Sequence, residues 1–171
     1  MTNLTKIALG GGCHWCTEAV FQALKGVDCV AQGFVASEKD SSTFSEAVIV
    51  YFNKQVIPLK VLINIHLLTH KSSVNHSMRS KYRSAVYTFS EAQFTEANML
   101  LTEFKSSTFK NLVTQVLPFK AFKASRQDLQ NYYIKNPDKP FCKKYINPKL
   151  HLLLQEFSVH TNQEKLMNLK T

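Results

Sequence analysis

Residues 10–21 read GGGCHWCTEAVF, and this stretch decides how the rest of the chain is interpreted. Three glycines lead into Cys13, and Cys16 follows after two residues. The preceding TKIALG (5–10) predicts a short buried strand, whereas HWCTEAVFQALKG (14–26) predicts a helix with one apolar face. The order of strand, glycine turn, cysteine and helix therefore places Cys13 at the N-terminus of a helix.

This position has chemical consequences for Cys13. The first N–H groups of a helix have no partner within the helix, and together with the helix dipole they favour an anion. Such a setting lowers the pKa of a thiol, and the thiolate is the reactive form of cysteine. The glycines allow a ligand to approach the backbone closely. We therefore expect Cys13 to be reactive, and the alternative is a buried, inert cysteine beside a glycine-rich turn.

The C-x-x-C spacing allows three other uses. A thioredoxin-like redox pair has this spacing, but tryptophan inside the pair and three preceding glycines are unusual for that family. A c-type haem attachment needs histidine after the second cysteine, where Thr17 stands. A zinc site needs two further ligands, and the available residues contain no second closely spaced pair: Cys29, Cys142, His14, His66, His70 and His76. No metal site is predicted.

Length and composition indicate a single globular domain over residues 1–171, with 44% hydrophobic residues. No apolar run approaches the roughly 18 residues that span a membrane, and no signal peptide is recognisable at the N-terminus. The cytoplasm is the expected compartment, where the four cysteines would stay reduced. The net charge of +9 is spread along the chain rather than concentrated. We therefore expect neither a nucleic-acid nor a membrane partner.

The remaining elements follow from hydrophobic periodicity and capping residues. Strands are expected at 27–35, 46–52, 82–89 and 112–119. Helices are expected at 59–70, 90–104 and 129–136, with a further packed helix in the tail after 150. Because strands and helices do not alternate regularly, the fold class is α+β: a mixed central β-sheet flanked by helices, with an irregular C-terminal segment.

Four blocks of the chain together indicate a family. The stretch GGGCHWCTEAVF resembles the signature of class A peptide methionine sulfoxide reductases, which typically read G-C-F-W followed by glycine or cysteine. The similarity continues through EAVIVYF (46–52), KYRSAVY (81–87) and LQNYYIKNPDKPFCKKYINPKL (129–150). These blocks occur in the order found in the family and extend over about residues 5–152.

The resemblance implies thiol-dependent reduction of methionine-S-sulfoxide, free or in peptides, to methionine. A cysteine thiolate attacks the sulfoxide sulfur and becomes a sulfenic acid. A second cysteine condenses with it to a disulfide, which thioredoxin reduces, or dithiothreitol in vitro. No bound cofactor is implied, and we expect a monomer. The alternative is a degenerate family member that binds sulfoxide or senses oxidants through Cys13 without useful turnover.

The resemblance also assigns roles around the substrate. Cys13 is the nucleophile, and Trp15 lines the apolar pocket that accepts the substrate methyl group. Glu46, at the start of a predicted strand, matches the family's acid. A partly buried carboxyl at this position can hold a proton and donate it. Tyr82 and Tyr132 match the two tyrosines that hydrogen-bond the sulfoxide oxygen.

Two cysteines are candidates for the resolving role. Cys142, in PFCKKY, lies where family members often carry a resolving cysteine, and the two lysines after it should favour its thiolate. Cys16 is the alternative resolver. Cys29, within a predicted strand, is expected to be buried and inert.

Several positions depart from the family pattern. His14 stands in place of phenylalanine and Phe34 in place of tyrosine, both among the predicted substrate-binding residues. The loop before Tyr82 is about four residues shorter than usual, with Ser77 at the position of an acidic residue, and Leu129 replaces a histidine. Losing hydrogen-bonding partners of this kind costs on the order of ten- to a thousandfold in rate. The sequence therefore predicts a working but divergent reductase that is slow or has a narrowed substrate range.

Overall fold

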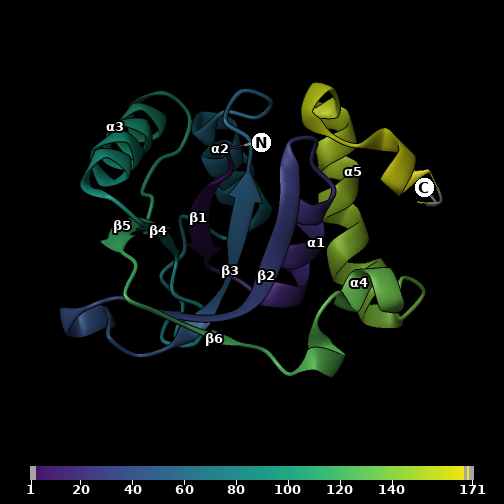
Figure 1. The fold of residues 1–171 in the computed structure, drawn as a ribbon, viewed down its shortest axis with the longest axis horizontal. Helices are drawn as coiled ribbons and strands as arrows, with labels where there is room; N and C mark the ends of the chain where they lie inside the picture. Colours follow the sequence, from purple (N-terminus) through teal and green to yellow (C-terminus); the bar gives the residue numbers. More distant parts are fainter. Residues whose placement is uncertain (1–2, 168, 170–171) are drawn as a thin grey trace.

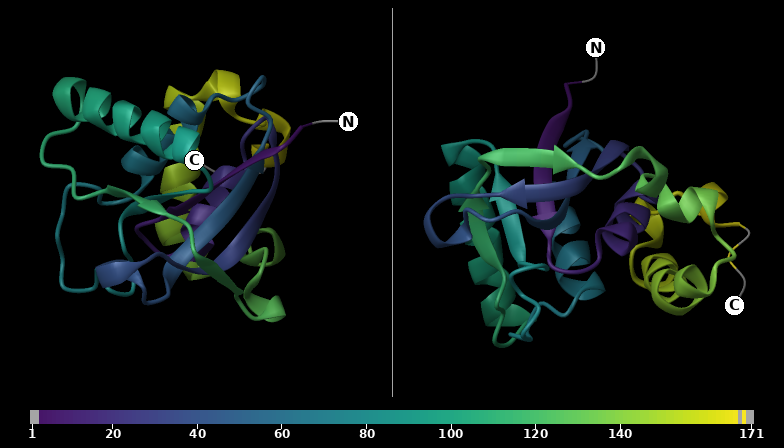
Figure 2. Two further views of the ribbon diagram at one scale, coloured as in Figure 1. Left: turned by 60° about the vertical axis from the view of Figure 1, so that its left-hand side comes forward. Right: turned by 90° about the horizontal axis from the view of Figure 1, so that it is seen from below.

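The structure is a computed structural model that describes residues 3–167 and residue 169 (Figures 1 and 2). Six strands form one mixed sheet in the spatial order β5-β4-β1-β3-β2-β6. Their bounds are β1 (Thr5–Gly10), β2 (Val27–Ala36), β3 (Ser45–Phe52), β4 (Ala85–Thr88), β5 (Gln115–Pro118) and β6 (Ala121–Ala124). The β4–β5 pair is parallel, and the other four pairs are antiparallel.

The two edges of the sheet approach each other. β5 and β6 lie at opposite ends of the strand order, yet only Phe119 and Lys120 separate them in the chain. Lys120 N–H donates to the carbonyl of Ala36 (3.1 Å), and the Ser37 hydroxyl donates to the carbonyl of Pro118 (2.6 Å). The sheet is therefore curled, with β6 running below the other strands in Figure 1.

The helical elements are interspersed with these strands. The helices are α1 (His14–Gln22), α2 (Leu59–Thr69), α3 (Glu91–Ser107), α4 (Tyr132–Lys135) and α5 (Asn147–Glu156). The 3₁₀ turns are Lys39–Ser41, Gln127–Leu129, Ser158–His160 and Gln163–Leu166, and Cys142–Ile146 is a π-helical turn. In Figure 1, α3 lies at the β4–β5 end of the sheet, whereas α1 and α5 lie at the β2 end. No helix in the described part of the chain is long and apolar enough to cross a membrane.

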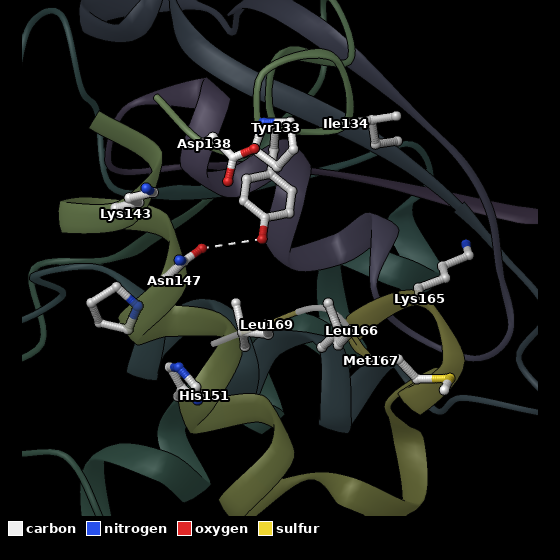
Figure 3. Close-up of a pocket in the computed structure, with 12 residues that line it drawn as sticks. Tyr133, Ile134, Asp138, Lys143, Asn147, His151, Lys165, Leu166, Met167 and Leu169 are labelled. Atoms are coloured by element: carbon white, nitrogen blue, oxygen red, sulfur yellow. Dashed lines mark hydrogen bonds between the residues drawn. The ribbon is translucent and has the colours of Figure 1, made fainter. Parts of the chain in front are cut away.

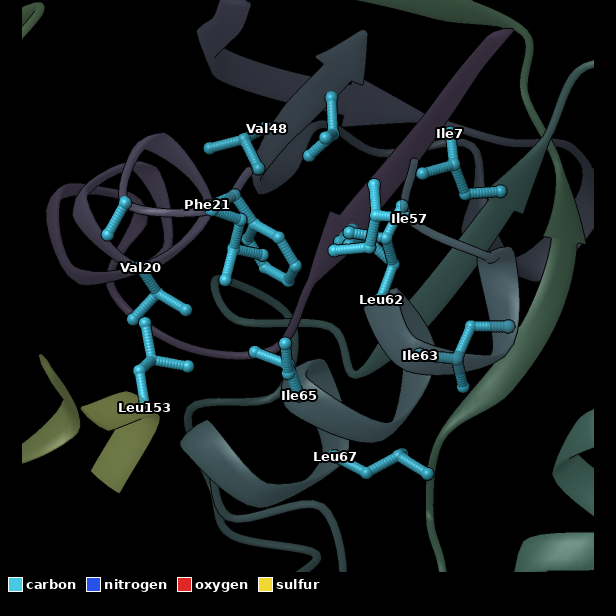
Figure 4. Close-up of a cluster of buried hydrophobic side chains, with 14 of the residues drawn as sticks. Ile7, Val20, Phe21, Val48, Ile57, Leu62, Ile63, Ile65, Leu67 and Leu153 are labelled. Carbon is cyan, nitrogen blue, oxygen red and sulfur yellow. The ribbon is translucent and has the colours of Figure 1, made fainter. Parts of the chain in front are cut away.

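One face of the sheet and the helices share the main hydrophobic core (Figure 4). Alternate residues of the central strands point into it because successive side chains of a strand point to opposite faces. Ile7 of β1, Val48 of β3 and Phe21 of α1 meet there, and none of them is exposed to solvent. A smaller cluster around Tyr87 covers the opposite face. The main core therefore fixes α1, and with it Cys13, against the sheet.

Phe21 should be among the most sensitive core positions. Phe21→Ala removes a fully buried ring between α1 and the sheet. We expect the free energy of unfolding to fall by about 3–5 kcal/mol, measured by urea denaturation. Val159→Ala, at a side chain that is 77% exposed, should change it by less than about 0.5 kcal/mol. Equal effects of the two substitutions would contradict this packing.

The α+β class and the mixed sheet flanked by helices are confirmed. The tail contains the expected helix, but α5 begins at Asn147, before residue 150. The sequence prediction of a helix over 129–136 is wrong for half of that range, since only Tyr132–Lys135 is α-helical. Asn131 adopts a left-handed conformation (φ 56°). Its N–H and that of Tyr132 donate to the carboxylate of Glu18, so this backbone is held by a side chain instead of by a longer helix.

Strand predictions were wrong at β4 and at the two edge strands, β5 and β6. The strand expected at 82–89 begins only at Ala85, because the preceding residues belong to a loop that closes over the start of β3. The strand expected at 112–119 is limited to β5, and β6 was not predicted at all. Edge strands pair on one side only, so their sequences carry a weaker hydrophobic pattern than central strands.

Candidate active site

Cys13 occupies the N-cap position of α1, as predicted from the glycine turn. Its carbonyl accepts hydrogen bonds from the N–H groups of Cys16 (3.1 Å) and Thr17 (3.2 Å). The turn before it needs glycine, because Gly11 has a φ of +151° and a Cβ there would lie 2.5 Å from the Cδ2 atom of His70. Cys13 itself is half-buried and therefore accessible from one side.

The surroundings of Cys13 favour its thiolate. A hydrogen bond from the Cys16 thiol is the largest cause, and it lowers the pKa of Cys13; the N–H groups of Trp15 and Cys16 act in the same direction. Burial and the nearby Glu46 carboxylate oppose this shift. The same hydrogen bond, with burial, raises the pKa of Cys16. Of the two thiols, Cys13 is therefore the one that ionises first.

His14 and Glu46 form a buried pair beside Cys13, with exposures of 4% and 6%. The Nε2 atom of His14 lies 3.1 Å from Oε1 of Glu46, and its Nδ1 lies 2.8 Å from the carbonyl oxygen of Gly33. Oε2 of Glu46 has no hydrogen-bond partner among the described residues, and Lys81 Nζ is 4.0 Å away from it. Phe34 contacts the His14 ring edge-on, with ring centroids 5.2 Å apart. Three predicted site residues thus meet at one point.

Trp15 and Tyr132 form the aromatic side of the site. Their rings are stacked, with centroids 4.1 Å apart and an angle of 11° between the planes, and Phe141 meets Trp15 edge-on at 5.4 Å. Trp15 Nε1 is buried without a hydrogen-bond partner among the described residues. These rings form an apolar surface of the kind that was predicted for Trp15. Phe141, which was not predicted, is part of this surface.

Glu18 holds this aromatic side in place and was not predicted. Its carboxylate is buried and accepts hydrogen bonds from the N–H groups of Asn131 (3.0 Å) and Tyr132 (3.1 Å) and from Nε2 of Gln32 (3.0 Å). Burial raises the pKa of Glu18, and these hydrogen bonds oppose the increase. A signal was present in the sequence, because Glu18 is four residues after His14 and therefore on the same helix face.

Tyr82 lies on the loop before β4, and this loop is hydrogen-bonded to the start of β3, next to Glu46. The carbonyl of Lys81 accepts hydrogen bonds from the N–H of Glu46 and the hydroxyl of Ser45, both at 2.9 Å. Lys81 Nζ lies 5.1 Å from the centroid of the Tyr82 ring. Arg79, which was not predicted, donates from Nη1 to the carbonyls of Gly11 and Tyr82, both at 2.9 Å. This guanidinium therefore connects the loop to the glycine turn before Cys13.

The other two cysteines differ from their sequence predictions. Cys142 is fully buried in the π-helical turn, where burial raises the pKa of its thiol. Lys143 and Lys144 are exposed, and the cation that favours its thiolate is Lys139, so the predicted effect of the two following lysines is wrong. Cys29 is exposed rather than buried, because it lies where a bulge shifts the pairing of β2 with β3.

Two neutral histidines support the glycine turn. Nε2 of His66 donates to the carbonyl of Gly10 (2.8 Å), and Nδ1 of His70 donates to the carbonyl of His66. Nε2 of His70 is 2.8 Å from the hydroxyl of Ser84 and accepts from it. Burial is the largest cause that lowers the pKa of both histidines, of His70 to about 4. Both rings are therefore uncharged near neutral pH.

Stability should consequently fall in acid. The pKa of His70 is about 4 in the fold and near 6.5 in the unfolded chain, so protonation in this range favours unfolding. Its contribution, about 3 kcal/mol, is fully present above pH 6.5 and is lost as the pH falls to about 4. Urea unfolding across this range should show a smaller pH dependence in His70→Gln than in His160→Gln. Equal pH dependence in both variants would contradict this role.

A separate cavity lies between α4, α5 and the C-terminal turn (Figure 3). It has a volume of about 1120 Å³, and the Tyr133 hydroxyl donates to Asn147 at its wall (3.1 Å). None of the predicted site residues lines it. Within residues 3–167 and 169, no group of three histidine, cysteine or acidic side chains is arranged to hold a metal ion.

An ionisable cysteine at a helix N-terminus, a second thiol that hydrogen-bonds to it and a buried carboxyl beside it define a thiol-based oxidoreductase. A sequence model of the peptide methionine sulfoxide reductase family matches residues 5–162. The peptide methionine sulfoxide reductase MsrA of a Psychrobacter species is 35% identical over an alignment of 167 positions, which covers 88% of this chain and 95% of the relative.

Solved structures agree with this match. Reduced Mxr1 from Saccharomyces cerevisiae has a TM-score of 0.71 and 25% identity, over 81% of this chain and 89% of the yeast chain. Mxr1 in complex with Trx2 has a TM-score of 0.60 and 22% identity, over 75% of this chain and 84% of the yeast chain. The chain belongs to the peptide methionine sulfoxide reductase family, MsrA type. It is accordingly a peptide-methionine (S)-S-oxide reductase.

Proposed function

We propose that Cys13 is the nucleophile of this reductase and Glu46 its acid. The observation that carries the proposal is the position of Cys13 at the N-terminus of α1, where the Cys16 thiol lowers its pKa. The buried Glu46 carboxyl lies beside it, and its Oε2 is free of hydrogen bonds among the described residues. The stacked rings of Trp15 and Tyr132 supply the apolar surface for the substrate methyl group. Tyr82 supplies a phenol on the loop beside Glu46.

The proposed reaction needs only the Cys13 thiolate, the Glu46 proton and the sulfoxide. The Cys13 thiolate attacks the sulfoxide sulfur while a proton passes from Glu46 to the sulfoxide oxygen. The oxygen leaves as the hydroxyl of a Cys13 sulfenic acid, so the substrate sulfur is reduced to the thioether and the Cys13 sulfur is oxidised. The Glu46 carboxylate is then ready to take a proton back from solvent.

Cys16 is proposed as the first resolving cysteine, in place of the Cys142 that the sequence favoured. The Cys16 thiol already hydrogen-bonds the Cys13 sulfur, whereas Cys142 is fully buried in its turn. Condensation of Cys16 with the sulfenic acid gives a Cys13–Cys16 disulfide and releases water. Cys142 would exchange with this disulfide in a later step that opens its π-helical turn.

Thioredoxin is the proposed reductant. Two observations support this proposal. A similar yeast protein was solved in complex with Trx2. Cys13 is half-buried, so the thiolate of a reductant could reach its sulfur when Cys13 is part of a disulfide. No bound cofactor is proposed. We propose a monomer that acts as one domain over residues 1–171. Free cysteines are typical of the cytoplasm, the proposed compartment, and the dispersed charge suggests no nucleic-acid partner.

The activity is tested with the separate S and R epimers of a methionine sulfoxide peptide. We expect dithiothreitol, and thioredoxin with its reductase, to support reduction of the S epimer only. Reduction of neither epimer by folded protein with reduced Cys13 would contradict the proposed function. Activity with dithiothreitol but not with thioredoxin would contradict only the proposed reductant.

A further inference from the structure

The contact between Nε2 of His14 and the carboxyl of Glu46 requires a proton on one of these two groups. A carbonyl oxygen only accepts hydrogen bonds, so the Nδ1 of His14 carries a hydrogen toward Gly33, 2.8 Å away. A neutral imidazole then has no hydrogen on Nε2, the atom that lies 3.1 Å from Oε1 of Glu46. A carboxylate and a bare ring nitrogen both only accept. One further proton must therefore be bound by one of the two partners.

We propose that His14 and Glu46 act as a dyad that binds one proton jointly and keeps it available to the sulfoxide oxygen. In one state the proton is on Nε2 and Glu46 is ionised, and in the other it is on Glu46 and His14 is neutral. Transfer from Nε2 to the carboxyl forms the acid before the attack, and after the proton has passed to the sulfoxide oxygen the dyad takes up one proton from solvent. His14 is then a positioning residue that acts through Glu46, a role that rests on the proposed function of Glu46 as the acid.

The surroundings limit the dyad to this exchange. Both side chains are buried, the Phe34 ring covers the edge of the imidazole, and the carbonyl of Gly33 fixes its orientation. β2 and β6 meet closely there, since a Cβ on Gly33 would lie 2.3 Å from the carbonyl oxygen of Lys123. The ring therefore has little freedom to rotate away from Glu46.

Three other titratable groups face the dyad from neighbouring elements. Lys81 Nζ, on the loop, is 4.0 Å from Oε2 of Glu46. Glu18 interacts with His14 from the next turn of α1, and the Cys13 thiol interacts with Glu46. Lys81 favours loss of the shared proton, whereas Glu18 and a Cys13 thiolate favour its retention. Formation of the thiolate and retention of the proton thus support each other, and both are needed for the attack.

His14→Gln is the sharpest test. An amide can donate a hydrogen bond to Oε1 but cannot bind a proton, so it stabilises the ionised carboxyl. In single-turnover methionine release, from about pH 5 to about pH 9, we expect the variant to lose about tenfold in rate near pH 8 and to approach the wild type near pH 5.5. His160→Gln is the matched control and should follow the wild-type profile.

A second measurement keeps the test independent of activity. In ¹⁵N NMR spectra of the imidazole, His14 should show a hydrogen on Nδ1 throughout, and its Nε2 signal should respond to Glu46→Gln. A His14→Gln profile parallel to the wild type, reduced by one factor at every pH, would overturn the proposal, and so would an Nε2 signal unchanged by Glu46→Gln. If no protein releases methionine, the proposed function fails, and the NMR result still decides the dyad.

Discussion

Replacing Cys13 by serine is expected to abolish methionine formation, with a loss of at least about a thousandfold in single-turnover rate. A serine hydroxyl at the N-terminus of α1 does not ionise near neutral pH, and it cannot accept the oxygen as a sulfenic acid. The fold should be unaffected, because serine is a favourable residue at a helix N-cap and the Cys13 side chain makes no capping hydrogen bond to α1. The rate is measured as methionine released per protein with dithiothreitol as reductant.

Cys29→Ser is the control for this loss. Cys29 is the exposed cysteine at the bulge of β2, so its replacement should leave the rate within about twofold. Substantial methionine release by Cys13→Ser would contradict the assignment of the nucleophile. Loss of activity in both variants would point instead to a general sensitivity of the fold.

Removal of the Glu46 proton is expected to have the second largest effect. Glu46→Gln keeps the size of the side chain and a hydrogen bond to His14, but an amide cannot protonate the sulfoxide oxygen. We expect the rate of methionine release to fall by about a hundred- to a thousandfold near neutral pH. The alkylation of reduced Cys13 by iodoacetamide should continue in the variant, because removal of the Glu46 charge favours the thiolate.

The exposed acid Glu38 provides a matched comparison. Glu38 forms a surface ion pair with Lys120 (3.4 Å), so Glu38→Gln should leave methionine release unchanged. If Glu46→Gln and Glu38→Gln have similar rates at equal thermal stability, another group supplies the proton. Tyr82→Phe would then be the next variant to measure.

The fold around the nucleophile was predictable because its signals are local. The apolar residues of β1, the glycine turn and the helix pattern lie within one stretch of about twenty residues, and periodicity suffices to interpret them. By contrast, β6 and the shortened α4 depend on partners far along the chain. The backbone at Asn131 follows the carboxylate of Glu18, 113 residues earlier, which no local pattern records.

The candidate site was predictable in composition but not in its contacts. Resemblance to a family gave Cys13, Trp15, Glu46, Tyr82 and Tyr132. The structure places the first three and Tyr132 at the N-terminal end of α1, and Tyr82 on the loop beside Glu46. The resemblance gave no indication that His14 would pair with Glu46, since the family carries phenylalanine there. Burial likewise changed the expectation for Cys142: the two following lysines were expected to favour its thiolate, but its thiol is enclosed in the fold, and burial raises its pKa.

The most direct measurement is a single turnover of fully reduced protein with a methionine-S-sulfoxide peptide and no added reductant. Methionine is quantified, and the disulfide is located by mass spectrometry after alkylation of the remaining thiols. We expect one methionine per protein and a Cys13–Cys16 disulfide at the earliest times. A first disulfide between Cys13 and Cys142 would contradict the proposed order of the cysteines. The absence of methionine from folded protein would contradict Cys13 as the nucleophile of a working reductase.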